Sequence, residues 1–272
     1  MHLIPLLLYG FAAGAYLAHF ARRDEGIGRI ATGLLGAALL SHTFIIGMQT
    51  VQAGYAPLVG TTAAVSAFVW LLGLAYLYVE LTTSERAMGV LVAALLAVLY
   101  IIPALDPAVS PRPAVLRSPL FSLHVLAMLF AYASFALACV VGVTYGLLFK
   151  EIKAKHLGFF YARLPSLQVL DVMNARAVTI GWIFLTIGIS IGGIWATQVQ
   201  SSPDPRVQAM SVQDPKILVA LVCWGVYSFA LFARRAIGWT GRRAALLSTV
   251  AFVIVLLNFV PVGYFLTKSH NF

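Results

Sequence analysis

The stretch SPLFSLHVLAMLFAYASFALACVVGVTYGLLFK, residues 118–150, decides the fold class of this chain. Before its final lysine it contains no Asp, Glu, Lys or Arg, and it holds a single histidine, His124. A helix rises 1.5 Å per residue, so about 20 apolar residues cross the hydrocarbon core of a bilayer. We therefore expect a transmembrane helix over about 119–149, long enough to protrude from the membrane.

The rest of the chain has the same character. Of its 272 residues 61% are hydrophobic and only 10% are charged, whereas a soluble domain carries about 25% charged residues. The pattern predicts an all-α integral membrane protein, a single membrane domain over 1–272 with a bundle of eight transmembrane helices. The apolar segments lie at about 3–21, 30–53, 58–79, 87–105, 119–149, 177–197, 216–233 and 244–266. The first is expected to be a retained helix, because its positive charges follow the apolar run instead of preceding it.

The basic residues predict the orientation. An even number of spans puts both termini on one side of the membrane. Most of the 18 Lys and Arg residues fall in the alternate loops 22–29, 80–86, 150–176 and 234–243. The positive-inside rule makes these loops cytoplasmic and both termini extracytoplasmic. The net charge of +9 is thus spread over short loops and gives no basic domain for a nucleic acid.

Two connecting segments are long enough to matter. Residues 150–176 are expected to form a cytoplasmic interfacial segment, with an amphipathic helix broken at Leu164-Pro165. Residues 196–215 form the longest polar interruption and are expected to be an extracytoplasmic loop, entered from Trp195 and closed by Asp214-Pro215-Lys216.

Two histidines share the outer face. His124 lies about one turn into the fifth span, and His270 lies just beyond the eighth span. Two imidazoles at one membrane surface can supply both axial ligands of a haem iron. Either histidine taken alone is also compatible with an interfacial hydrogen-bonding residue.

His42 is different, because it falls near the middle of the second span. A polar group at that depth needs a partner. Two readings stay open: a hydrogen bond to a neighbouring helix, or a ligand to a haem within the membrane.

Other chemistry is scarce. Cys139 and Cys223 are the only cysteines, and the span limits separate them by roughly 18 Å in depth, beyond disulfide reach. Motifs of hydrolases, P-loop proteins and dinucleotide-binding proteins are lacking. The span limits put no carboxylate deep in the membrane, which disfavours an ion-coupled transporter. We do not expect this chain to be a catalyst by itself.

Several stretches resemble the membrane proteins of cytochrome c assembly, the family of CcsA-, CcmC- and HemX-type proteins, with a core over about 40–270. SPLFSLHVLAMLFAYASFAL resembles the helix that bears the family's first external histidine. LPSLQVLDVMNARAVTIGWIFLTIGISIGGIWA resembles the segment leading into its Trp-rich loop, and DPK the end of that loop. CWGVYSFALFARRAIGWTGRRAA resembles the next helix and basic turn, and GYAPLVGTTAAVSAFVW the third span.

The resemblance implies a multi-pass protein of the bacterial cytoplasmic (inner) membrane that binds haem b. It implies His124 and His270 as external axial ligands of the iron and His42 as a ligand to a possible second haem. Trp195 and Asp214 would belong to the haem-facing loop. The implied partners are haem, the lipid bilayer, a ResB-type membrane protein and apocytochrome c, and a haem-attachment (lyase) complex is the setting that the resemblance implies for them.

Two departures from CcsA-type proteins stand out. Trp195 is the only tryptophan of its loop, and Phe232 occupies the position of a histidine that CcsA-type proteins carry before the basic turn. These departures favour the HemX-like branch. The alternative function is therefore a regulator or scaffold that affects haem biosynthesis through the level of glutamyl-tRNA reductase, with residues 150–176 contacting a soluble partner. A transporter unrelated to haem is the third hypothesis.

Overall fold

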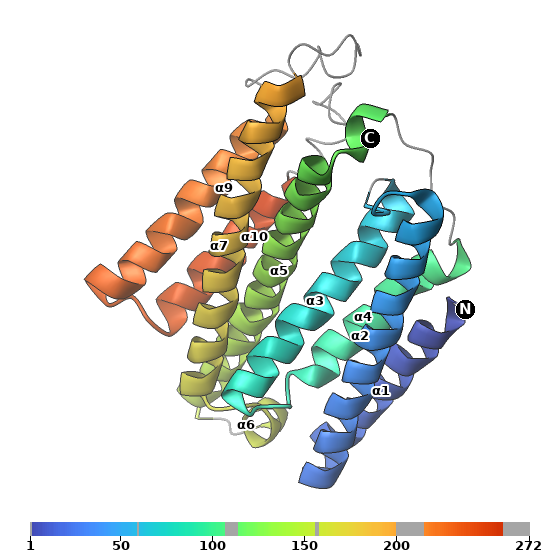
Figure 1. Cartoon of the computed structure of the whole chain (residues 1–272). Coiled ribbons are helices and arrows are strands. Elements are labelled where there is room, and N and C mark those ends of the chain that lie inside the picture. Colours follow the sequence, from blue (N-terminus) through green and yellow to red (C-terminus); the bar gives the residue numbers. More distant parts are fainter. Residues whose placement is uncertain (1, 59, 107–113, 156–157, 200–214, 258–272) are drawn as a thin grey trace.

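The computed structural model describes residues 2–58, 60–106, 114–155, 158–199 and 215–257, and all regular structure in these ranges is helical (Figure 1). The long helices are α1 (Leu3–Arg22), α2 (Glu25–Ala53), α3 (Thr61–Thr83), α4 (Gly89–Leu105), α5 (Pro119–Lys153), α7 (Leu167–Val199), α9 (Pro215–Phe232) and α10 (Arg242–Leu257). The short elements are η1 (Ala114–Arg117), α6 (Phe159–Arg163) and η2, a π-helical turn (Ala233–Ile237).

The helical, multi-pass class is confirmed, and each apolar segment of the sequence contains one long helix. Six helices of the described chain are long and apolar enough to cross a membrane: α1, α2, α3, α5, α7 and α9, the last counted together with η2. Helix α4 has 17 residues and the described part of α10 has 16, so the number of eight spans is not established. The orientation of the termini stays a prediction.

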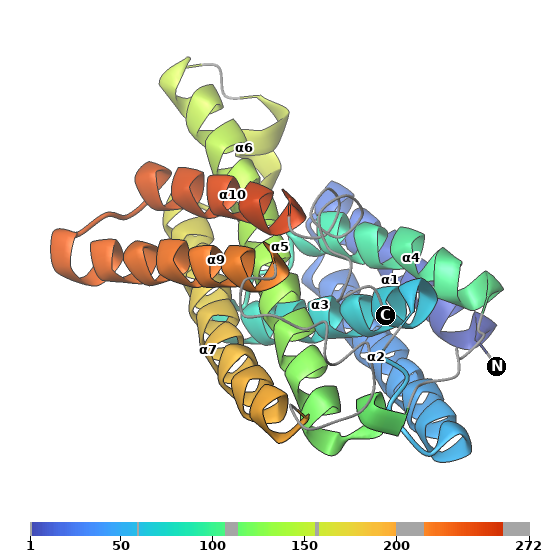
Figure 2. The ribbon, with the colours of Figure 1, turned by 90° about the horizontal axis from the view of Figure 1, so that it is seen from above.

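Helices α5 and α7 form the centre of the bundle (Figures 1 and 2). Helix α3 packs against α5 and joins the layer of α1, α2 and α4 to this centre, while α9 and α10 cover its other side. Glycines of α7 make the close approach possible. A Cβ on Gly181 would lie 2.4 Å from the ring of Phe135, and one on Gly188 would lie 2.8 Å from the sulfur of Met128.

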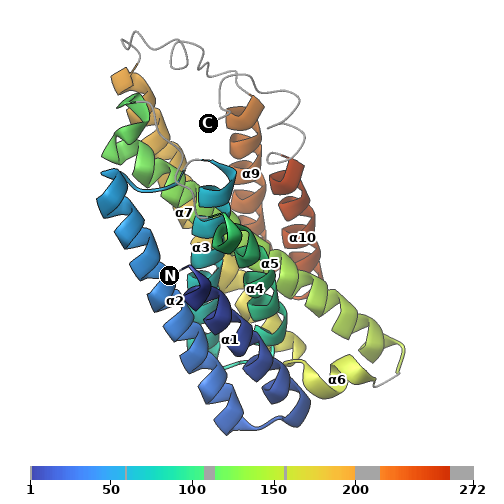
Figure 3. The same cartoon turned by 90° about the vertical axis from the view of Figure 1, so that its right-hand side faces the viewer.

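The connections alternate between the two ends of the bundle. The α1–α2, α3–α4 and α9–α10 turns and α6 lie at one end, and the α2–α3 connection and the start of α5 lie at the other (Figures 1 and 3). The loops that carry most of the basic residues therefore share one end. This arrangement is the one that the positive-inside argument requires.

The two connecting segments are shorter than the sequence suggested. Helix α7 begins at Leu167, so the later part of the 150–176 segment extends a long helix. The break at Leu164-Pro165 separates α6 from α7, as expected for a residue that lacks a backbone N–H. At the other end α7 continues to Val199, so Trp195 stands on a helix and not in the 196–215 loop.

One carboxylate is buried near the end of a span, directly after the limit of residue 79 drawn from the sequence. Helix α3 runs on to Thr83, which places Glu80 within the helix, where it is 1% exposed. Its carboxylate accepts hydrogen bonds from the Tyr16 hydroxyl at 2.6 Å and the Thr32 hydroxyl at 2.5 Å. The guanidinium Nε of Arg86 lies 4.0 Å away. Span limits drawn from hydropathy stop at the first charge, but a carboxylate with enough partners can be buried.

The two cysteines are free, as the separation in depth predicted. A thiol in an apolar helix bundle packs as a small hydrophobic group, so we expect neither cysteine to be reactive.

Candidate functional site

His124 stands in the second turn of α5 and faces α7. Its Nδ1 lies 2.8 Å from the carbonyl oxygen of Gly188. A carbonyl oxygen only accepts hydrogen bonds, so Nδ1 must carry the hydrogen. In a neutral imidazole this fixes the lone pair on Nε2. Histidines that bind metals in proteins are oriented in the same way, by a hydrogen bond from the other ring nitrogen.

The His124 ring packs directly against Gly192, which we call the glycine seat. A Cβ at this position would lie 2.6 Å from Nδ1 and 2.7 Å from Cε1 of the imidazole. Gly188 and Gly192 are four residues apart and so share one face of α7. The neighbouring Gly193 faces open space, with nothing within 4 Å of its Cβ position. The helix backbone thus approaches the imidazole closely because Gly192 lacks a side chain, while Gly188 makes room for Met128 of α5.

Trp195 lies one turn beyond Gly192 and is 5% exposed. Its indole packs against Phe121 with ring centroids 5.0 Å apart, and both belong to a small apolar cluster with Leu116 of η1. The indole N–H is buried and has no hydrogen-bond acceptor among the residues that the structure describes. The N–H of a buried tryptophan usually donates to an acceptor. This N–H is therefore available to an acceptor that lies outside the described residues.

His42 lies in the other half of the bundle, where α1, α2, α3 and α4 meet. The residue is fully buried, with Nδ1 3.1 Å from the Tyr9 hydroxyl and Nε2 2.9 Å from the Ser66 hydroxyl. Tyr100 packs edge-on against its ring at 4.5 Å. Both ring nitrogens are therefore hydrogen-bonded, as the interhelical reading of this histidine predicted. Iron ligation by His42 would require one of these bonds to be replaced.

The remaining sequence-derived positions are less informative. His270 and Asp214 lie outside the described residues. Phe232, the residue at the position of the CcsA-type histidine, ends α9 with its side chain 59% exposed. Among the described residues no group of three or more His, Cys, Asp and Glu could hold a metal ion. A haem iron needs only one or two protein ligands.

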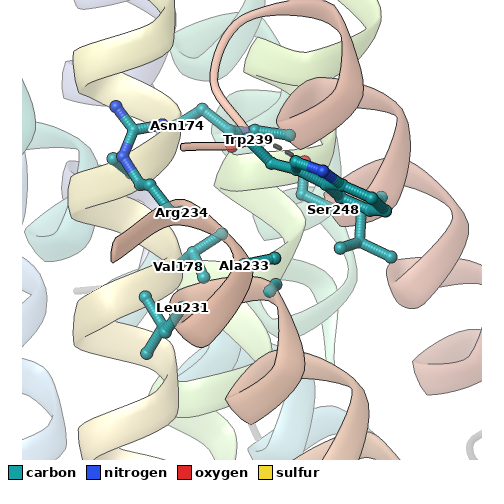
Figure 4. Close-up of a pocket in the computed structure, with 11 residues that line it drawn as sticks. Asn174, Val178, Leu231, Ala233, Arg234, Trp239 and Ser248 are labelled. Atoms are coloured by element: carbon teal, nitrogen blue, oxygen red, sulfur yellow. Dashed lines mark hydrogen bonds between the residues drawn. The ribbon is translucent and has the colours of Figure 1, made fainter. Parts of the chain in front are cut away.

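A second polar contact lies near the opposite end, between α7, α9, η2 and α10 (Figure 4). Asn174 donates from Nδ2 to the Ala138 carbonyl and to the Ser248 hydroxyl, each at 2.8 Å. The cavity beside them has a volume of about 20 Å³. That is room for about one water molecule, so these residues connect helices and are not a site for a larger ligand.

Sequence reasoning named His124 and Trp195 but missed the groups that position them. The Gly188 carbonyl, Gly192, Phe121 and Leu116 come from three elements, and none carries reactive chemistry. One signal was available: small residues four apart in an apolar helix indicate close helix packing. The spacing alone does not say which side chain fills the space above them.

Comparison with known proteins gives a consistent result. A family model described as cytochrome C assembly protein matches residues 2–270. The chain is 25% identical over 290 residues to the cytochrome c biogenesis protein CcsA of Guillardia theta, covering 99% of this chain and 92% of that protein. It is 26% identical over 306 residues to CcsA of Prochlorococcus marinus strain MIT 9303, covering 98% and 93%.

A shorter match is closer in sequence. Over 110 residues the chain is 34% identical to CcsA of Parasynechococcus marenigrum, covering 40% of this chain and 34% of that protein. The relatives named here are all CcsA proteins, so the comparisons do not support the HemX-like placement that the single tryptophan and Phe232 favoured. Because the family model spans nearly the whole sequence, this chain belongs to the cytochrome c assembly protein family.

Proposed function

We propose that this chain acts in cytochrome c biogenesis by holding haem b at the end of the bundle where α5 begins and α7 ends. His124 and His270 would hold the haem iron, and Trp195 and Asp214 would lie beside the bound group. The relatives' names support the pathway. The predicted topology supports the extracytoplasmic side.

The observation that carries this proposal is the hydrogen bond between His124 Nδ1 and the Gly188 carbonyl. It selects the tautomer whose Nε2 can bind iron, and it fixes the ring on two packed helices. The site residues fit haem in this respect.

The apolar cluster gives a second reason. Phe121 and Trp195 offer aromatic surface for a porphyrin, and the unpaired indole N–H can donate to an oxygen acceptor of the bound group. When bound, haem supplies the vinyl groups that form thioethers with apocytochrome thiols. The chain itself orients the group and excludes water from one side of it. A ResB-type membrane protein is the proposed partner in presenting haem to apocytochrome c.

For His42 the bonding favours a structural role. Its two hydrogen bonds join three helices, and replacing either with an iron bond would leave a hydroxyl in the bundle without its partner.

The direct test is an absorption spectrum. The protein is expressed with an ample haem supply, purified in detergent, and measured before and after reduction with dithionite. We expect a b-type spectrum with sharpened bands in the reduced state and about one haem or more per chain by pyridine haemochrome. A colourless protein that is folded by circular dichroism and monodisperse on size exclusion would overturn the proposal.

The glycine seat gives a sharper prediction. Gly192→Ala places a methyl group within the contact distance of the His124 ring and displaces it from its hydrogen bond. Loss of the group that orients a metal-bound histidine lowers affinity about 10- to 100-fold, and we expect a fall of that size in haem per chain. Gly193→Ala is the matched control, since its Cβ meets nothing within 4 Å. Equal haem content in Gly192→Ala and Gly193→Ala protein would contradict the role of Gly192 in positioning His124.

A further inference from the structure

The turn between α9 and α10 is held in one shape by a single carboxylate. Asp171 of α7 receives two hydrogen bonds from the Arg234 guanidinium, at 2.9 and 2.6 Å, and one from the Gly241 backbone N–H at 2.8 Å. Gly238 and Gly241 both adopt positive φ, at 76° and 61°, which favours glycine. The backbone between them is thus preorganised.

This turn lines an open surface cavity of about 490 Å³. It lies at the periphery of the bundle, at the end opposite the start of α5 (Figures 1 and 2). Backbone, aromatic, hydroxyl, cationic and apolar groups line it: Gly238, Trp239, Thr240, Arg242, Arg243 and Leu246.

The two arginines of the cavity are held against aromatic rings, and no carboxylate of the described residues neutralises their charge. The Arg242 guanidinium lies 5.3 Å from the centroid of the Phe149 ring, and that of Arg243 lies 5.8 Å from the centroid of the Trp239 ring. Asp171, the carboxylate that holds the turn, is already paired with Arg234. No acidic side chain of the described residues pairs with Arg242 or Arg243. Stacked guanidinium groups of this kind are well suited to phosphate.

An apolar surface continues from the cavity along α10. Leu246, which lines the cavity, is 61% exposed, and Val250 and Val253 are each 51% exposed. These residues are four and three apart and so follow one face of the helix. A cationic cavity at a membrane surface that leads into an exposed apolar face has the polarity of a phospholipid, with its phosphate above its acyl chains. A free phosphate ion would not need the apolar part.

We propose that this cavity binds the headgroup phosphate of an anionic phospholipid, with Arg242 and Arg243 on the phosphate and an acyl chain along Leu246, Val250 and Val253. Thr240 and the Trp239 indole lie at the headgroup level. The site lies at the far end from His124 and is independent of the proposed haem function.

The test measures lipid retention by native mass spectrometry of the full chain in detergent. Phosphatidylglycerol is titrated into wild-type protein, into the double variant Arg242→Gln/Arg243→Gln and into Arg235→Gln. Arg235 is an exposed arginine of the same turn that does not line the cavity, so its variant is the matched control. Losing two arginines that contact the lipid phosphate is expected to weaken binding roughly thirtyfold. The control loses no group that lines the cavity, so its binding should change little.

Two further arms make the result specific. Phosphatidylcholine, which has a phosphate but no net charge, is expected to bind much more weakly than phosphatidylglycerol. Millimolar inorganic phosphate is expected to leave phosphatidylglycerol bound. Equal loss in the double variant and in Arg235→Gln would show only a diffuse charge effect and overturn the site, and displacement by inorganic phosphate would identify a small-anion site instead. If the double variant does not fold, the single variant Arg243→Gln is titrated in its place.

Discussion

Replacing His124 with alanine is expected to remove nearly all haem from the purified protein. The variant loses the Nε2 ligand that the Gly188 hydrogen bond orients. Its effect should therefore equal or exceed the roughly 10- to 100-fold loss that follows from removing an outer partner of a metal ligand. Pyridine haemochrome content and the reduced-minus-oxidised spectrum measure it, and the yield of holocytochrome c in cells reports the consequence.

Controls separate ligation from packing. His124→Gly leaves a space at the imidazole position, and free imidazole in the buffer is expected to restore the b-type spectrum there but not in His124→Phe. His156→Ala removes a histidine that the sequence assigns to the opposite side of the membrane, and haem content should not change. An unaltered spectrum in His124→Ala would exclude this residue as a ligand, and failure of imidazole rescue in a folded variant would argue for a purely structural role.

Glu80→Ala is expected to give the largest loss of stability. It leaves the Tyr16 hydroxyl without its acceptor and leaves the Thr32 hydroxyl only the Gly28 carbonyl. It also removes a carboxylate 4.0 Å from Arg86, whose closer partner is Glu25 at 2.9 Å. Breaking a buried charged network from one side is typically destabilising by about 3–5 kcal/mol. The contacts that fail would be those joining α1, α2 and α3, so this half of the bundle should open first.

The measurement is reversible unfolding in mixed micelles, followed by circular dichroism as the fraction of denaturing detergent rises. Glu80→Gln keeps one carbonyl acceptor and should lose distinctly less than the alanine variant. Asp106→Ala, at an exposed carboxylate just beyond α4, is the control and should unfold like wild type. If Asp106→Ala protein were as unstable as Glu80→Ala protein, the buried network around Glu80 would make no specific contribution to stability.

The fold class and the approximate position of every long helix were predictable. Apolar runs such as residues 119–149 form helices in lipid because a helix satisfies its own backbone hydrogen bonds without water. Helix ends were predicted less well. Helix α7 starts ten residues before the expected 177, because Asp171 and Asn174 find partners on η2, α5 and α10 that hydropathy does not count.

The candidate site was predicted only in part. His124 was identified as a candidate because it shares the predicted outer face with His270, and two imidazoles at one surface can bind a haem iron. Trp195 was expected in a loop, yet it is buried on α7 against Phe121, since the helix continues to Val199. The comparisons do not support the HemX-like branch that the missing aromatic residues favoured, since the relatives that they name are CcsA proteins.

By itself, then, the sequence determined that this chain is a helical membrane protein with a histidine near one end of its longest helix. Both properties follow from local composition, since a run of apolar residues selects lipid and helix without reference to any neighbour. Only the tertiary structure decided which histidine is oriented like a metal ligand and which is used to join helices. His124 and His42 differ in their partners, a glycine carbonyl on α7 against two hydroxyls on α1 and α3. Those partners are set by the rotation and close approach of packed helices, which depend on residues far apart in the chain.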